Sequence, residues 1–177
     1  MTRLNDVPSF ELNVRRNRQV DGFTLIELLI VMSVMLILMT LAIPQLLKVS
    51  KTANETSATA SVHAIGQAEL EYNSSYPSTG FACGLAPLGG LPGTPPSPQA
   101  GQMLDPTLAG GVKSGYKFAI TNCSKVTVNN HDMITGYEIT AVPVSIGRSG
   151  DRGYCMDENN IMKFDPAGGT NCTQSLQ

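Results

Sequence analysis

The sequence opens with a sharp division between polar and apolar positions. A polar segment over residues 1–22 is followed by 25 residues, Phe23 to Leu47, in which Glu27 is the one charged side chain. As a helix, such a run is long enough to cross about 30 Å of hydrocarbon. Three basic residues stand just before it: Arg15, Arg16 and Arg18. A basic flank of this kind holds its side of the helix in the cytoplasm, so the pattern predicts a single membrane-spanning helix.

The next segment, residues 48–72, has the composition of an amphipathic helix. Its apolar positions recur mostly every three or four residues, which places them on one helical face. They are Val49, Ala53, Ala60, Ile65, Ala68 and Tyr72. Pro44 and Gly66 are soft points in a helix that otherwise runs from Phe23 to Tyr72. Pro44 is expected to bend the helix rather than end it.

After Tyr72 the pattern changes to loops and short strands. Residues 84–111 hold seven glycines and six prolines, so neither a helix nor a strand is expected to propagate there. Four later runs have strand-like composition: Gly115–Thr121, Gly136–Val142, Arg152–Asp157 and Asn160–Phe164. Glu158-Asn159 predicts a tight turn between the last two, and the tail from Asp165 is expected to be coil.

These segments predict an α+β protein. A long N-terminal helix, its first half transmembrane, packs its second half on a small antiparallel sheet. The expected parts are a leader at 1–22, the membrane helix at 23–47, its amphipathic continuation at 48–72, a Pro/Gly-rich loop at 73–114, and the sheet with a disulfide-bonded C-terminal region at 115–177.

Composition narrows the possible functions. The net charge of −2 gives no general reason to bind nucleic acid, and no direct nucleic-acid site is readable. His63 and His131 are isolated from other metal ligands and are interpreted as surface residues, which argues against zinc. No serine lies in a nucleophile-elbow pattern. We therefore expect neither an enzyme nor a cofactor or resident metal. Acidic residues near Glu158 leave calcium as an alternative, although they lack the regular spacing of a calcium loop.

Four cysteines follow the apolar run: Cys83, Cys123, Cys155 and Cys172. The expected topology places them outside the cytoplasm, where disulfides persist, and no CxxC spacing suggests a metal site. Among the three possible pairings, nearness in sequence favours Cys83–Cys123 and Cys155–Cys172. The alternative is four free, buried cysteines.

The junction between leader and apolar run carries the most specific signal. Residues 20–28 read Val-Asp-Gly-Phe-Thr-Leu-Ile-Glu-Leu, and the far side of the run lacks a good conventional signal-peptidase site. The junction resembles the class III leader of type IV prepilins and pseudopilins, with Gly22 before the cut, Phe23 after it and Glu27 at the fifth mature position. Pro44 falls at mature position 22, where many members of that family carry proline.

The resemblance implies cleavage after Gly22 and N-methylation of Phe23, both by the prepilin peptidase. A buried carboxylate in lipid is expensive unless it is paired, so we predict that Glu27 of one subunit neutralises the new α-amine of Phe23 in its neighbour. The alternative is that Glu27 lies at the headgroup boundary and has no role in assembly. The resemblance also implies that the helix melts near Pro44 when the subunit enters a filament, whereas the simpler interpretation is that Pro44 ends the membrane span.

The expected function is that of a structural subunit. The first hypothesis is a type IV pilin anchored in the inner membrane, with its C-terminal domain outside the cytoplasm, and later part of an extracellular homo-oligomeric pilus. Its partners would be the prepilin peptidase and the inner-membrane pilus assembly machinery. The alternative is a pseudopilin of a type II secretion system. A membrane-anchored enzyme or binding protein is the third hypothesis, but no clustered catalytic residues support it. Adhesion, motility and DNA uptake stay open as roles of the filament.

Overall fold

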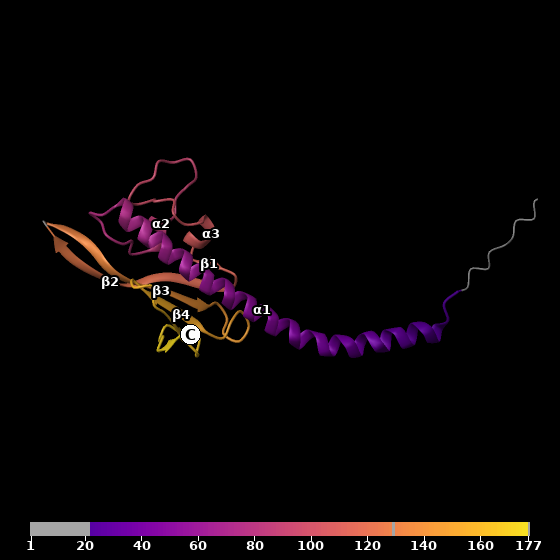
Figure 1. Ribbon diagram of the computed structural model, residues 1–177. Coiled ribbons are helices and arrows are strands. Elements are labelled where there is room, and N and C mark those ends of the chain that lie inside the picture. The colour runs from indigo at the N-terminus through magenta and orange to yellow at the C-terminus, as the bar shows by residue number, and fades with distance from the viewer. Residues whose placement is uncertain (1–21, 129, 177) are drawn as a thin grey trace, which may run out of the picture. The chain divides into compact units, whose positions relative to one another are not determined.

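The computed structural model describes residues 22–128 and 130–176 of the chain, without the side chains of Leu41 and Pro44. All of the predicted leader except Gly22, including its basic flank, lies outside these residues. The chain divides into two compact units, Met1–Leu41 and Ala42–Gln177. Helix α1, Leu25–Ser75, begins in the first unit and ends in the second (Figure 1). It therefore extends three residues beyond the predicted end at Tyr72.

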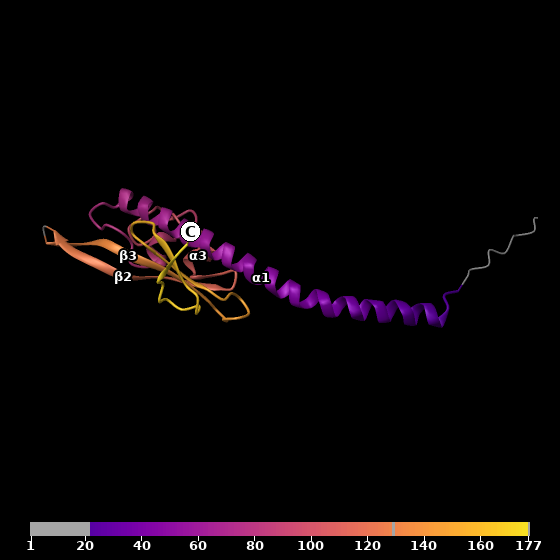
Figure 2. The same cartoon turned by 60° about the horizontal axis from the view of Figure 1, so that its bottom comes forward.

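Six antiparallel strands form one sheet in the order β1-β2-β3-β4-β5-β6, so that each strand pairs with the next one along the chain. The strands are β1 Val112–Lys113, β2 Tyr116–Val128, β3 His131–Pro143, β4 Gly153–Asp157, β5 Met162–Asp165 and β6 Gln174–Ser175. Together with α1 they confirm the predicted α+β class. Figure 2 shows β2 and β3 as the long paired strands of this sheet.

The four predicted strand runs correspond to β2, β3, β4 and β5, with three differences. Strands β2 and β3 continue beyond the predicted runs through a polar stretch and pair up to Val128 and His131, so the exposed His131 begins strand β3. Strand β6 lies in the tail that was predicted as coil. Residues 73–114, predicted as a Pro/Gly-rich loop, contain strand β1 and two four-residue helices, α2 Leu85–Leu88 and α3 Pro106–Ala109.

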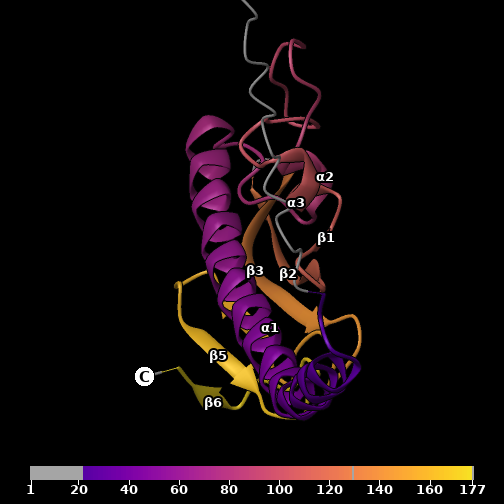
Figure 3. The same cartoon turned by 90° about the vertical axis from the view of Figure 1, so that its right-hand side faces the viewer.

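The core forms where the second half of α1 packs on the sheet, and Figure 3 shows the helix lying along it. The helix contributes a stripe at four- and three-residue spacing, in which each side chain is almost fully buried: Ala58, Val62, Ile65, Ala68 and Tyr72. The predicted face was only half right, because Val49, Ala53 and Ala60 are exposed. An alanine-rich helix offers several stripes of similar spacing, and tertiary contacts select one of them.

Gly66 is a close-packing position rather than a soft point. A Cβ at this residue would collide with the Met156 methyl group on β4 and touch the Asn160 side chain at 3.0 Å. The missing side chain therefore lets the helix and the sheet approach one another, a common reason for glycine inside a helix.

Two disulfides close the loops around this core. Cys83–Cys123 joins the segment after α1 to β2, and Cys155–Cys172 joins β4 to the tail. The β2–β3 register shifts between Thr121 and Ser124, and Asn122 adopts a positive φ of 52°. Such a bulge re-aims a side chain, and here Cys123 packs partly buried against the core. This pairing is the one that sequence nearness favoured.

Candidate functional site

Helix α1 begins with a reciprocal pair of hydrogen bonds between Thr24 and Glu27. The Glu27 Oε2 atom accepts the Thr24 backbone N–H at 2.9 Å and its hydroxyl at 2.8 Å, while the Thr24 Oγ1 atom accepts the Glu27 N–H at 3.3 Å. Thr24 is the N-cap and Glu27 the third helical residue, so the pair is a capping box. This capping role of Glu27 was not predicted from the sequence, although Thr-x-x-Glu before an apolar run is the usual signature of a capping box.

The predicted cleavage point lies immediately before this cap. Gly22 and Phe23 are outside the helix, the Phe23 side chain is 81% exposed, and a Cβ at Gly22 would have no neighbour within 4 Å. The Gly22–Phe23 peptide bond is thus in an open, non-helical segment, as a protease substrate must be.

The apolar side chains of α1 after this junction are uncovered by the part of the chain that the structure describes. Leu25 is 81% exposed, and Leu46 is 67% exposed near the other end of the run. A window of 18 residues in this helix is long and apolar enough to cross a membrane, and none of it is buried in the described chain. So much exposed hydrophobic surface marks a site for lipid or protein contact.

Two polar side chains inside the apolar run are internally satisfied. The Ser33 hydroxyl donates to the Leu29 carbonyl at 2.8 Å, and the Thr40 hydroxyl donates to the Ile37 carbonyl at 2.7 Å. Because these groups need no water, neither opposes insertion into lipid. Glu27 therefore stays the one charged side chain of the run, and its two hydrogen bonds both fall on Oε2.

Pro44, which was predicted to bend or melt the helix, lies within α1, whose helical assignment is unbroken from Leu25 to Ser75. Pro44 thus does not end the helix in this single chain. The predicted melting concerns the assembled filament and stays a prediction.

A second unusual carboxylate, Glu69, was absent from the sequence analysis. It lies next to Ala68 on the buried side of α1 with no exposed surface, and its Oε2 atom accepts the Ala82 N–H at 2.7 Å. Burial raises the pKa of Glu69 to about 8, and the Ala82 hydrogen bond opposes this shift. Its Oε1 atom and the Tyr137 hydroxyl are both buried without a hydrogen-bond partner among the described residues. No sequence pattern predicted a buried carboxylate at this position, because acidic residues usually lie on the exposed face of an amphipathic helix.

The residues considered for metal binding have ordinary structural positions. His63 and His131 are exposed, and the described residues contain no cluster of three or more His, Cys, Asp or Glu side chains able to hold a metal ion. The Asp157 carboxylate accepts the N–H groups of Asn159 and Ile161 at 3.0 and 3.1 Å. It therefore shapes the turn between β4 and β5.

Comparison with known families gives one match. The prokaryotic N-terminal methylation motif matches residues 17–43, which include the junction, the capping box and most of the apolar run. No curated protein and no solved structure matches the chain.

This match identifies the class III prepilin leader of type IV pilins and pseudopilins. The long apolar helix followed by a six-stranded antiparallel sheet is a pilin-like arrangement. Residues 17–43 therefore carry the N-terminal motif of type IV pilins and pseudopilins, and this leader implies processing by a prepilin peptidase.

Proposed function

We propose that the chain is the structural subunit of a type IV pilus. The observation that carries this proposal is the methylation motif at residues 17–43, which includes most of an apolar run that the described chain leaves uncovered. Such a helix resides in the inner membrane before assembly and is transferred into the filament, where identical helices replace lipid. Because lipid is as apolar as the helix, close packing and charge pairing must favour this transfer.

The pairing partner for Glu27 is the amine that cleavage creates. An α-amine has a reference pKa of about 8, so the amine of Phe23 is largely a cation at neutral pH. An isolated carboxylate in a bilayer costs several kcal/mol, and a neighbouring subunit's amine removes both charges at once. The capping box supports this arrangement, because its bonds use Oε2 and a carboxylate accepts further hydrogen bonds through its other oxygen.

The disulfide-closed C-terminal region supports a filament subunit exposed to the outside. Four of the twelve basic residues and three of the fourteen acidic residues lie in the leader, so the processed chain has a net charge of −3. Together with two disulfides, this gives a solvated, covalently stabilised surface. Such a surface suits a shell around the helical filament core.

The experiment is mass spectrometry of filaments sheared from cells, compared with the membrane fraction. We expect a subunit that begins at N-methylated Phe23 and carries both disulfides, and we expect the filaments to disappear when the gene is deleted. A Gly22→Val variant is the control, since it blocks cleavage while the chain keeps its membrane helix.

Two outcomes contradict the proposal. If the processed chain stays in the envelope and its deletion stops protein secretion without loss of filaments, it is a type II secretion pseudopilin. If residues 1–22 stay attached to a dispersed, water-soluble chain, the pilin-like interpretation of the helix itself is wrong.

A further inference from the structure

The loop between β3 and β4 exposes two large apolar side chains beside a basic residue. Val144 is 64% exposed and Ile146 is 63% exposed, and the whole segment 144–148 is exposed, including Arg148. We call the domain formed by the second half of α1 and the sheet, residues 48–177, the head. Neither apolar side chain belongs to its core.

Backbone hydrogen bonds close this loop into a turn. The Ser145 carbonyl accepts the N–H groups of Arg148 and Ser149 at 3.1 and 2.9 Å, and the Gly147 N–H donates to the Gly150 carbonyl at 2.9 Å. Gly147 has a φ of +83°, which glycine adopts without strain. Ile146 therefore lies in a tight turn, and the backbone of this turn leaves its side chain exposed.

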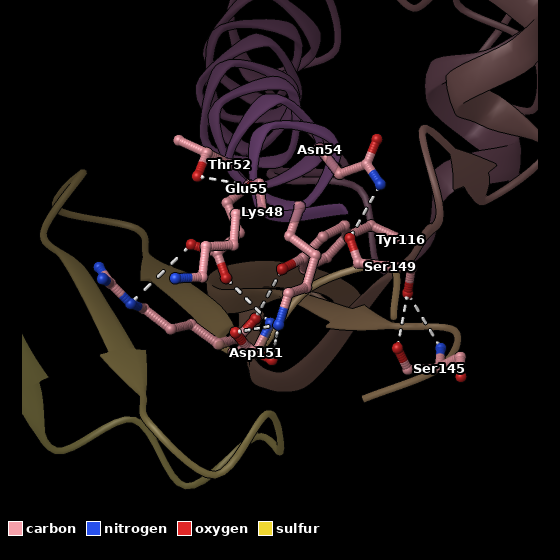
Figure 4. Close-up of polar contacts among 10 residues, drawn as sticks. Lys48, Thr52, Asn54, Glu55, Tyr116, Ser145, Ser149 and Asp151 are labelled. Carbon is pink, nitrogen blue, oxygen red and sulfur yellow. Dashed lines mark hydrogen bonds and ion pairs between the residues drawn. The ribbon is translucent and has the colours of Figure 1, made fainter. Parts of the chain in front are cut away.

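The loop is fastened to the part of α1 that follows the apolar run. The Lys51 Nζ atom lies 2.8 Å from Asp151 Oδ2, the Asn54 side chain donates to the Ser149 carbonyl at 2.9 Å, and Glu55 accepts the Asp151 N–H at 2.9 Å (Figure 4).

These contacts place the loop close to the end of the apolar run. Lys51 and Asn54 are four and seven residues beyond Leu47, so they are about 6 and 10 Å further along the helix axis. The polar headgroup layer of a bilayer is about 5–7 Å thick on each side. Counted along the helix, the two residues that hold the loop therefore lie within one to two thicknesses of this layer from the end of the apolar run.

The charges on this side of the head suit an anionic surface. Asp151 is paired with Lys51, and Glu55 lies 3.9 Å from the Arg152 Nε atom. Among the described residues, Lys48 and Arg148 form no ion pair, and both are exposed. Two cations outside these ion pairs therefore remain, Arg148 on the loop itself and Lys48 on the turn of α1 that follows the apolar run.

We propose that residues 144–148 form a second contact with the bilayer, in which Val144 and Ile146 enter the boundary between headgroups and acyl chains while Arg148 and Lys48 bind lipid phosphates. The proposal rests on the membrane anchoring in the proposed function. Lipid is favoured over a second copy of the chain because Ile43 and Leu46, exposed apolar residues at the end of the apolar run, belong to the same compact unit as the loop. The contact would fix how the head sits on the membrane before assembly.

The test uses the full chain reconstituted into vesicles of phosphatidylethanolamine and phosphatidylglycerol with brominated acyl chains. The natural chain has no tryptophan, so an Ile146→Trp variant reports from one position. A Leu91→Trp variant is the matched control. Leu91 is 74% exposed in the Pro/Gly-rich loop, whose Pro98 carbonyl accepts the Tyr72 hydroxyl, and Tyr72 lies about 37 Å beyond Leu47 along the helix.

We expect bromine to quench Ile146→Trp several-fold more than Leu91→Trp, with Val144→Trp behaving like Ile146→Trp. Adding Arg148→Gln to Ile146→Trp should lower the ratio of lipid-contacting to free indole about fivefold. This is the fold-change expected from losing one basic residue at an anionic surface. Near-ultraviolet circular dichroism and intact disulfides identify variants that have kept their fold.

Equal quenching at positions 146 and 91 overturns the proposal. So does protection of position 146 that appears only at high protein density and without bromine quenching, since this assigns the loop to a contact between copies. Flotation of the protein with the vesicles tests the helix anchor separately, so failure of the loop contact is distinguishable from failure of membrane anchoring.

Discussion

At the residue scale, Glu27 has two possible roles, as a helix cap and as a charge partner, and substitution can separate them. Glu27→Gln keeps a capping-box side chain and removes the charge, whereas Thr24→Val keeps the charge and removes the cap hydroxyl. We expect Glu27→Gln to abolish most filament formation. Thr24→Val should have a small effect, because losing an N-cap costs about 1 kcal/mol. Sheared filament yield, normalised to membrane-bound subunit, measures both.

Normal filaments with Glu27→Gln would show that Glu27 acts through the cap alone and that no charge pairing takes place. Loss of filaments with Thr24→Val at normal subunit levels would point to the same conclusion.

The buried carboxyl of Glu69 makes the stability of the head depend on pH. Its pKa is raised from the usual 4.5 to about 8, so between these values the folded state holds a proton that the unfolded state has released. The free energy of unfolding therefore falls as the pH rises through this window, by at most about 1.4 kcal/mol per pH unit. This stability is fully present below pH 4.5 and lost above about pH 8.

We expect Glu69→Gln to remove this slope, because an amide keeps an oxygen for the Ala82 N–H without titrating. The exposed neighbour Glu71 supplies the control, since Glu71→Gln should leave the slope in place. Thermal unfolding at several pH values measures both variants, and a slope that persists in Glu69→Gln would assign the proton to another group.

At the element scale, the C-terminal disulfide stabilises a tail that has little other structure. Strand β6 contains two residues, both exposed, and Cys155–Cys172 closes a 17-residue separation. Loop-closure entropy predicts a contribution of about 3 kcal/mol. The double variant Cys155→Ser/Cys172→Ser should lose about this much stability in urea unfolding of the full chain in detergent. An unchanged midpoint and slope would mean that the bond does not form in the cell.

The helix around Pro44 is the element whose state we expect to change on assembly. Proline supplies no N–H and clashes with the carbonyl four residues earlier, so the turn before Pro44 is the weakest in the run. In Pro44→Ala this turn should resist opening, with slower amide exchange over residues 40–47 in filaments than in the wild type. Equal exchange, or a filament map with an unbroken wild-type helix, would show that Pro44 has no such role.

Strands with strand-forming residues and a clear turn were predictable from the sequence, whereas elements without a regular buried face were not. The runs that became β4 and β5 were found because they combine strand-forming residues with a turn. The β2–β3 extension was missed because most of its positions beyond Thr121 are exposed, so the sequence shows no alternation there. On α1, a buried side that includes Glu69 violates the hydrophobic pattern on which such predictions rest.

At the scale of the whole molecule, the head has the core of an independent domain. Its buried residues run from Ala58 on α1 to the strands, and both disulfides lie within it. A chain starting at Lys48 should therefore be monomeric in solution without detergent and unfold at the same temperature as the head of the full chain. Gel filtration and calorimetry test this, and aggregation of this fragment would mean that the head needs the apolar segment to fold.

The candidate assembly site was predictable for a different reason than the head. Gly22, Phe23 and Glu27 lie within six consecutive residues, so their combination can be recognised in the sequence without knowledge of the fold. The contact of the β3–β4 loop with Lys51 and Asn54 joins residues about 100 positions apart. Only the folded sheet brings them together, and no local pattern announces it.

The Cys155–Cys172 bond also imposes an order of events on the biogenesis of the subunit. In the proposed topology, with the C-terminal region outside the cytoplasm, its ring cannot close until β4, β5 and the tail have been exported, because the thiols meet an oxidising compartment only there. Cells that lack a thiol oxidase in their envelope should therefore accumulate anchored, reduced subunits whose tails are sensitive to added protease. An oxidised Cys155–Cys172 pair therefore indicates that the chain has crossed the membrane at least as far as Cys172.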